Sequence, residues 1–189
     1  MLLSAALLYF VPFELLAAYI ISCLLHELCH LAAMFWFKVD ILSFRIEARG
    51  FVIEHGKISS FCGELICILA GPFGGLLFSF LCSWLSVTLA FRWLELCAAI
   101  SLILSIFNLL PCLPLDGGKA LRCLLSLFLA EQTVNHALML TGTAVSLFLA
   151  VYGLCFWRNG YGYGTAAAGF LLLFSILFEE GIVKTRALR

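Results

Sequence analysis

The sequence predicts an all-α polytopic membrane protein of about six transmembrane helices, with one small β-hairpin between the second and the third. Composition is the first observation behind this fold class. Of the 189 residues, 64% are hydrophobic and 12% are charged, which leaves too few polar side chains to cover a water-soluble domain. The second observation is that several apolar stretches approach or exceed the roughly 20 residues that a helix needs to cross a bilayer.

The apolar stretches and the residues that interrupt them define the individual elements. The predicted crossings are residues 2–14, 15–37, 61–91, 93–130, 137–157 and 163–180. The first crossing is short for a bilayer, since Pro12 and Glu14 interrupt it. No internal repeat or linker separates these stretches, so residues 1–189 are predicted to form a single membrane-embedded domain.

Residues 41–55 differ from the long apolar stretches of the chain in the order of their apolar and polar residues. Apolar and polar residues alternate on both sides of Gly50, a pattern typical of a β-hairpin. A two-stranded hairpin leaves unpaired backbone groups along its outer edges, and an extended peptide can pair with such an edge. The residues predicted to bind a peptide in this way are Gly50, Phe51, Val52 and Ile53.

Charge and cysteine content exclude two classes of function. The 11 basic and 11 acidic residues balance, and no basic patch of the kind that binds nucleic acid is present in the sequence. None of the nine cysteines forms a C-x-x-C pair, which argues against a disulfide framework and against a structural zinc knuckle. We therefore expect a lipid bilayer, and no nucleic acid, among the partners of this chain.

The basic residues also predict the orientation of the protein in the membrane. With six crossings, most Lys and Arg residues fall on the side that holds the hairpin and the C-terminus, while Arg92 and Arg158 fall on the other side. Cytoplasmic loops carry the excess of Lys and Arg. The sequence therefore predicts a multi-pass integral membrane protein with a cytoplasmic hairpin and C-terminus.

His26, Glu27 and His30 form the pattern H-E-x-x-H within the predicted crossing 15–37. Residues four apart share one face of a helix, so both imidazoles can bind one Zn²⁺ ion. Glu27 is turned about 100° from His26, which suits a general base acting on water beside the metal. Ionisable groups at membrane depth are costly and commonly functional, which favours a metal site over a solvated helix end.

A catalytic zinc takes three protein ligands and keeps one open position. Asp116 is the preferred third ligand, because it lies at a break between apolar stretches that is rich in Pro and Gly. Irregular backbone at membrane depth is tolerated where it lines a cavity. His55 and His136 are the other candidates, both in predicted loops, and an extramembrane turn is the alternative reading of the Leu-Asp-Gly-Gly segment.

The stretches HELCH at 26–30 and NLLPCLPLDGG at 108–118 together resemble the site-2 protease family of intramembrane zinc metalloproteases. The resemblance implies Zn²⁺ as cofactor, with His26, His30 and Asp116 as its ligands. It also implies that Glu27 is the catalytic acid and base of peptide-bond hydrolysis. The residues that it implies in supporting roles around the active site are Asn108, Pro111 and Gly117.

Within that family, the chain resembles most closely the bacterial sporulation proteases that process a membrane-associated sigma-factor precursor, pro-sigma-K. This resemblance implies such a precursor as substrate, membrane scaffold and inhibitor proteins as partners, and a bacterial cell membrane or forespore membrane as the location. The chain departs from the pattern in having Cys29 where HELGH has glycine, and in lacking the CBS domain that usually follows the last crossing; a PDZ domain is not predicted either.

Three other functions compete with a sporulation protease. The first is a housekeeping site-2-type protease that cleaves another substrate, such as a signal-peptide remnant or an anti-sigma factor. The second is a zinc-binding pseudoprotease that only captures membrane proteins, although the intact Glu27 argues against it. The third is a transporter, which would distribute charged residues along a path rather than gather them at one metal site.

Overall fold

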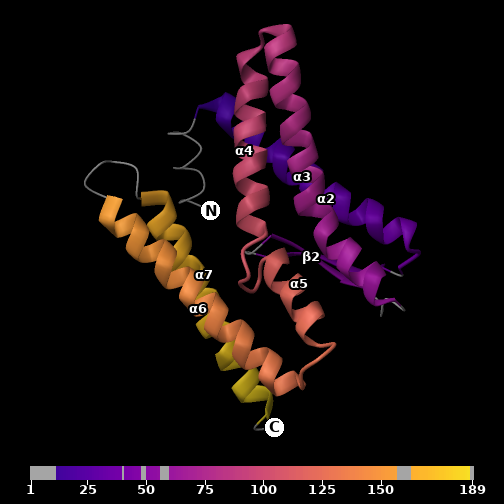
Figure 1. Cartoon of the computed structure of the whole chain (residues 1–189), viewed down its shortest axis with the longest axis vertical. Helices are drawn as coiled ribbons and strands as arrows, with labels where there is room; N and C mark the ends of the chain where they lie inside the picture. Colours follow the sequence, from indigo (N-terminus) through magenta and orange to yellow (C-terminus); the bar gives the residue numbers. More distant parts are fainter. Residues whose placement is uncertain (1–11, 40, 48–49, 56–59, 157–162, 188–189) are drawn as a thin grey trace. The chain divides into compact units, whose positions relative to one another are not determined.

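The computed structural model describes residues 12–39, 41–47, 50–55, 60–156 and 163–187 (Figure 1). The chain divides into two compact units, Met1–Phe107 and Asn108–Arg189, and each is described here by itself. Most of the predicted crossing 2–14 lies outside the described residues.

The first unit contains three helices and a two-stranded sheet. Helix α2 spans Phe13–Trp36, α3 spans Phe61–Leu89, and α4 spans Arg92–Asn108, so its last residue opens the second unit. Pro12 precedes α2 because proline lacks the N–H that a helix interior requires. Ala90 adopts a left-handed conformation with φ 51° and ends α3, so the chain reverses into α4.

Small residues form the interior of this unit, while large apolar residues face outward. The buried residues of α2 recur at every fourth position: Ala18, Ser22, His26, His30 and Met34. Phe80, Trp84 and Val87 of α3 are 68%, 61% and 82% exposed. Small residues let helices approach closely in lipid, where burial of apolar surface provides no force between helices.

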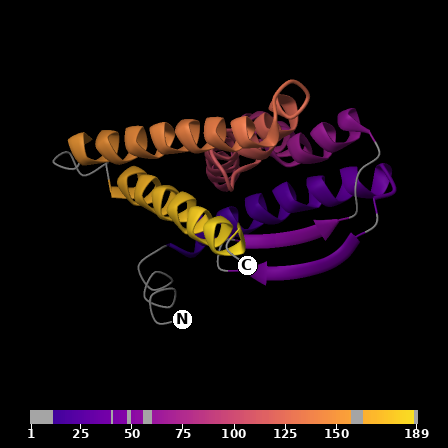
Figure 2. The same ribbon diagram turned by 90° about the horizontal axis from the view of Figure 1, so that it is seen from below.

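Strands β1 (Ile41–Glu47) and β2 (Gly50–His55) form an antiparallel pair (Figure 2). The register places Glu47 opposite Gly50 and Phe44 opposite Ile53, with an irregularity between Ile41 and Ser43. Within the described part of the chain the sheet has two strands, so each strand keeps one edge that no other strand pairs with.

The second unit contains the short helix α5 (Asp116–Leu125) and two long helices, α6 (Glu131–Phe156) and α7 (Tyr163–Ala187). Helices α6 and α7 lie side by side in both views (Figures 1 and 2). A Cβ atom on Gly153 would meet the backbone of Ala166, and one on Gly169 would meet the backbone of Ala150. These two glycines therefore allow the helices to pack backbone against backbone.

The predicted count of six transmembrane helices is wrong for the described residues. Six helices are described, but only α2, α3 and α6, with 24, 29 and 26 residues, are long and apolar enough to cross a membrane. Residues 93–130, predicted as one crossing, contain two shorter helices, because Pro111 and Pro114 interrupt the helical hydrogen bonding between α4 and α5. In α7 the apolar part is the shorter stretch Gly164–Ile176.

Candidate metal centre

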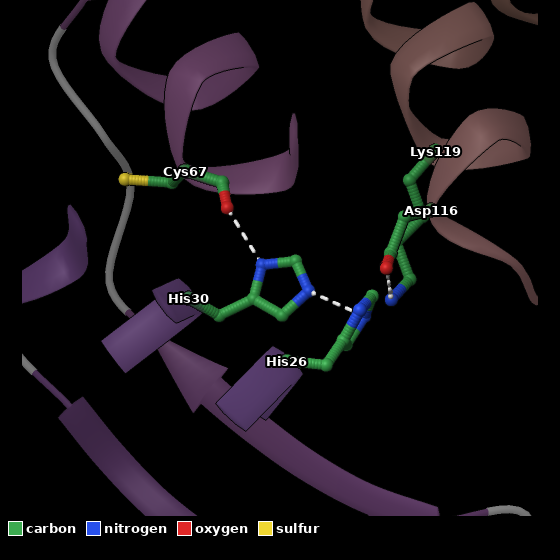
Figure 3. A network of polar contacts seen from close by, with 5 residues as sticks. All are labelled: His26, His30, Cys67, Asp116 and Lys119. Carbon is green, nitrogen blue, oxygen red and sulfur yellow. Dashed lines mark hydrogen bonds and ion pairs between the residues drawn. The ribbon is translucent and has the colours of Figure 1, made fainter. Parts of the chain in front are cut away.

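His26 and His30 present their ring nitrogens to one another from the same face of α2, as the H-E-x-x-H spacing predicts (Figure 3). Their Nε2 atoms lie 3.2 Å apart and both side chains are buried. Two nitrogens bound at about 2.0–2.1 Å to a tetrahedral zinc lie about 3.3 Å apart. The histidine pair thus fits two of the ligand positions of a Zn²⁺ ion.

A backbone contact fixes which nitrogen of His30 is available to a metal. His30 Nδ1 lies 2.8 Å from the carbonyl oxygen of Cys67 on α3 (Figure 3). A carbonyl only accepts hydrogen bonds, so Nδ1 carries the proton and donates it. His30 Nε2, which faces His26 Nε2, is then the ring nitrogen left to bind a metal. Outer contacts of this kind orient the histidine ligands of metal sites.

Gly71 provides the space in which the His30 ring lies. A Cβ atom at this position would overlap His30 Nε2 and would lie 2.7 Å from both Cδ2 and Cε1. Any side chain at residue 71 would therefore displace the imidazole from its present position. Glycine at residue 71 and the carbonyl of Cys67, one turn earlier on α3, together hold His30 in place.

Cys29 of α2 packs against Gly74 of α3, and its thiol is not part of the histidine pair. A Cβ atom on Gly74 would overlap Cys29 Sγ and would lie 2.8 Å from Cys29 Cβ. The small Gly74 therefore makes room for the thiol that replaces the usual glycine of HELGH. This arrangement supports packing rather than metal ligation as the role of Cys29.

Glu27 is partly buried on α2, next in sequence to His26. Its position about 100° around the helix from His26 places it beside the histidine pair and not on the same face. A carboxylate there would be suited to exchange protons with a molecule bound beside the histidine pair, and this role of Glu27 stays a prediction from the sequence.

Asp116, in the second unit, is the first residue of α5 and is 5% exposed. Its Oδ1 atom lies 2.9 Å from Lys119 Nζ, one turn later on the helix (Figure 3). A carboxylate is favoured at a helix N-terminus by the backbone dipoles as well as by such a cation. The carboxylate is the form of aspartate that binds metal, so this position suits Asp116 to the role of a ligand.

Two glycines fix the segment that presents Asp116. A Cβ atom on Gly117 would overlap the Leu109 carbonyl, and one on Gly118 would lie 2.5 Å from the carbonyl carbon of Cys112. Residues 109–113 therefore lie directly against the first turn of α5. The Cys112 thiol is buried and lies 3.9 Å from the Gly142 carbonyl, so the same segment is also held against α6.

The other predicted site residues lie at the following places. Asn108 is the last residue of α4 and is partly buried, while Pro111 is exposed in the segment between α4 and α5. Gly50, Phe51, Val52 and Ile53 lie in β2, each with a partner in β1. The positioning roles of Gly71, Gly74 and the Cys67 carbonyl were not predicted from sequence. The Gly-Pro pair at 71–72 and the Gly-Gly pair at 74–75 are typical of close packing or a break in membrane helices, so the sequence carries no signal for a role beside His30 or Cys29.

Comparison with known proteins supplies independent information on the chain. Residues 87–149, which include Asp116 but not the histidine pair, match the model of Peptidase family M50. No curated protein sequence matches the chain. The structure is similar to that of the site-2 protease from Methanocaldococcus jannaschii, with a TM-score of 0.72 and 23% identity over 94% of this chain and 83% of that chain. The chain therefore has the fold of a site-2 protease and carries a Peptidase family M50 match on the segment that holds Asp116.

Proposed function

We propose that this chain is a zinc-dependent intramembrane protease of the site-2 type. The observation that carries the proposal is the buried pair of Nε2 atoms 3.2 Å apart within a helix apolar enough to cross a membrane. The Peptidase family M50 match over residues 87–149 supports the same chemistry. A histidine pair with one ring oriented by a backbone carbonyl has the geometry of a metal site.

In this proposal His26, His30 and Asp116 are the residues that would hold the metal. Bound Zn²⁺ supplies Lewis acidity toward the scissile carbonyl and toward water. Glu27 accepts a proton from the attacking water as the oxygen of that water bonds to the carbonyl carbon. It then gives the proton to the amide nitrogen as the C–N bond breaks, so one water and one peptide bond become a carboxylate and an amine.

The hairpin binds the substrate in an extended form. A helical segment satisfies its own backbone hydrogen bonds, so it has to unwind before a protease can reach the peptide bond. The edge of β2, at Gly50, Phe51, Val52 and Ile53, offers backbone groups that can pair with such a strand.

Proline at Val52 or Ile53 should lower cleavage more than it lowers zinc binding, because proline removes a backbone N–H and disturbs the strand. Zinc per chain and cleavage of a membrane-tethered substrate provide the two measurements. Equal losses of both would point to misfolding and would contradict a substrate-binding role for this edge.

The resemblance to sporulation proteases favours a membrane-associated sigma-factor precursor as substrate, with membrane scaffold and inhibitor proteins as regulators. The distribution of Lys and Arg favours a cytoplasmic hairpin and C-terminus, which is the side where such a precursor is found. A housekeeping protease with another substrate is the alternative. Co-expression with candidate tethered substrates, one at a time, distinguishes the two.

Glu27→Gln tests the mechanism directly. The variant keeps the shape of the side chain and leaves the three proposed ligands in place, so zinc content and substrate capture should persist. Cleavage should fall by roughly 10²–10⁴-fold, the range for a positioned acid or base. The matched control is Glu14→Gln, in the first turn of the same helix. Cleavage at the parent rate by Glu27→Gln would refute the hydrolytic mechanism and favour a pseudoprotease.

Asp116→Asn tests the third ligand. A neutral amide oxygen is a weaker ligand than a carboxylate, so both zinc affinity and cleavage should drop. Full zinc content together with full activity would show that the third ligand lies elsewhere. His55 and His136 would then be the residues to test.

A further inference from the structure

A column of small polar residues runs through the first unit, on the side of His26 away from His30. The contacts between α2, α3 and α4 show which residues of the three helices lie at the same level along the column. The Trp93 ring N–H donates to the Glu14 carbonyl at 3.2 Å, and Ala18, one turn later, packs in one cluster with Cys82 and Cys97. Helices α2 and α4 thus run in parallel, with α3 antiparallel to both.

Continuing by four residues along α2 and α4, and back along α3 by three and then four residues, gives the next two layers of this interior. The first layer contains Ser22, Ser79 and Ser101, all of them buried. The second contains His26, Gly75 and Ser105. Two contacts support this register: Ser101 Oγ donates to the Gly75 carbonyl at 2.9 Å, and a Cβ atom on Gly75 would overlap Ser105 Oγ.

The four serines of the column differ in their hydrogen bonding. Ser79 donates to the Ala98 carbonyl at 2.7 Å and Ser101 to that of Gly75, so these two hydroxyls are satisfied. The Oγ atoms of Ser22 and Ser105 are fully buried and have no hydrogen-bond partner in the described part of the chain. A buried hydroxyl without a partner is costly, and buried water is the usual means of satisfying such groups.

We propose that Ser22 and Ser105, which lie in neighbouring layers of the column, bind an ordered water molecule inside the first unit, between the layer of His26 and the layer one helical turn behind it. A buried water makes about three hydrogen bonds, and the two hydroxyls supply partners from two helices. The layer of Ala18, Cys82 and Cys97 closes the apolar end of the column. Under the proposed protease function, this water replaces the one that each hydrolysis consumes. That role rests on the proposed function, whereas the water site itself does not.

Alanine substitutions at Ser22 and Ser105 test the water site, because the direction in which they shift the thermal midpoint of unfolding shows whether the hydroxyls are bound to a water. Ser22→Ala and Ser105→Ala are compared with the parent as full-length, zinc-stripped protein in detergent. If the hydroxyls hold a water, each substitution lowers the thermal midpoint by about 2–4 °C. The double variant then loses less than the sum of the two single losses, because both hydroxyls bind the same water.

Exposed Ser83, on α3, is the matched control, and Ser83→Ala should leave the midpoint unchanged. Midpoints that stay the same or rise in Ser22→Ala and Ser105→Ala would overturn the proposal, because removing an unsatisfied hydroxyl costs nothing.

Radiolytic footprinting in H₂¹⁸O gives a second reading that does not depend on stability or activity. Cys82 and Cys97 are 3% and 1% exposed, so bulk solvent does not reach them. A water bound one turn away should place ¹⁸O on them in the parent and not in the double variant. Absence of the label in the parent would overturn the site.

In zinc-loaded protein the double variant should keep its metal but cleave more slowly, whereas a failure of the protease proposal would appear as no cleavage by the parent.

Discussion

The two units of this protein hold their candidate metal ligands in opposite ways. In the first unit, His30 projects from the middle of a long helix and is positioned by a neighbouring helix through the Cys67 carbonyl and Gly71. In the second unit, Asp116 opens a short helix and is positioned by the residues just before it in sequence, which lie on Gly117 and Gly118.

This difference determines what a substitution should damage. A histidine side chain held between packed helices can be displaced while the helices stay in place. An aspartate held by a backbone segment cannot move unless that segment moves, because the contacts of Gly117 and Gly118 are with main-chain atoms. We therefore expect changes near His30 to alter the metal site, and changes near Asp116 to alter the fold of the second unit.

The largest effect is expected from Gly117→Ala or Gly118→Ala. The added Cβ atom meets backbone carbonyls that cannot rotate away, so the segment 109–113 has to shift. Overpacking of this kind costs about 1–3 kcal/mol, which corresponds to a midpoint roughly 2–12 °C lower and a loss of cleavage. The control is Gly164→Ala, where a Cβ atom meets nothing within 4 Å. A Gly118→Ala variant with the midpoint and activity of the parent would show that the segment is not held in this way.

A smaller effect on stability, but a specific effect on the metal, is expected from Gly71→Ala. Its Cβ atom displaces the His30 ring from the Cys67 carbonyl while the helix backbones stay in place. Loss of an outer contact to a histidine ligand commonly lowers metal affinity about 10–100-fold. Competition with a chelator measures the affinity, and the absorption spectrum of the Co²⁺ form reports the ligand geometry. An unchanged spectrum and affinity would mean that His30 is positioned by other contacts.

The smallest effect is expected from Cys29→Gly, which should keep zinc stoichiometry and activity, since the thiol only packs against Gly74. Gly74→Ala alone should lower the thermal midpoint, because its Cβ atom overlaps Cys29 Sγ. The same change in the Cys29→Gly background should cost little, which gives a measurable coupling between the two positions. Additive losses would contradict the contact, and loss of zinc in Cys29→Gly would identify Cys29 as a ligand.

Local sequence patterns predicted the parts of the site that lie close together along the chain. The four-residue spacing of His26 and His30 placed both on one face of a helix, and α2 confirms this placement. The alternation at residues 41–55 indicated extended arms where β1 and β2 occur. In both cases the periodicity of the backbone itself determines which side chains share a face.

Hydropathy alone could not predict how residues 93–130 divide. Leu109, Leu110, Leu113 and Leu115 keep this stretch apolar across the break between α4 and α5, so the sequence appeared to contain one crossing. The roles of Gly71 and Gly74 could not be predicted either. A glycine carries no chemical group, and its contact with a residue about 40 positions earlier depends on the register of two helices.

The hydrogen bond between His30 and residue 67 has a consequence for the evolution of this protein. Its acceptor is a main-chain oxygen, which every amino acid possesses, so the thiol of Cys67 contributes nothing to it. Mutation can therefore replace residue 67 without removing the contact, as long as the new side chain fits its buried place. Residue 71, one turn away, has no such freedom, since the imidazole occupies the space of its missing side chain. An alignment of descendants of this gene would thus show glycine kept at residue 71 and different side chains of similar size at residue 67.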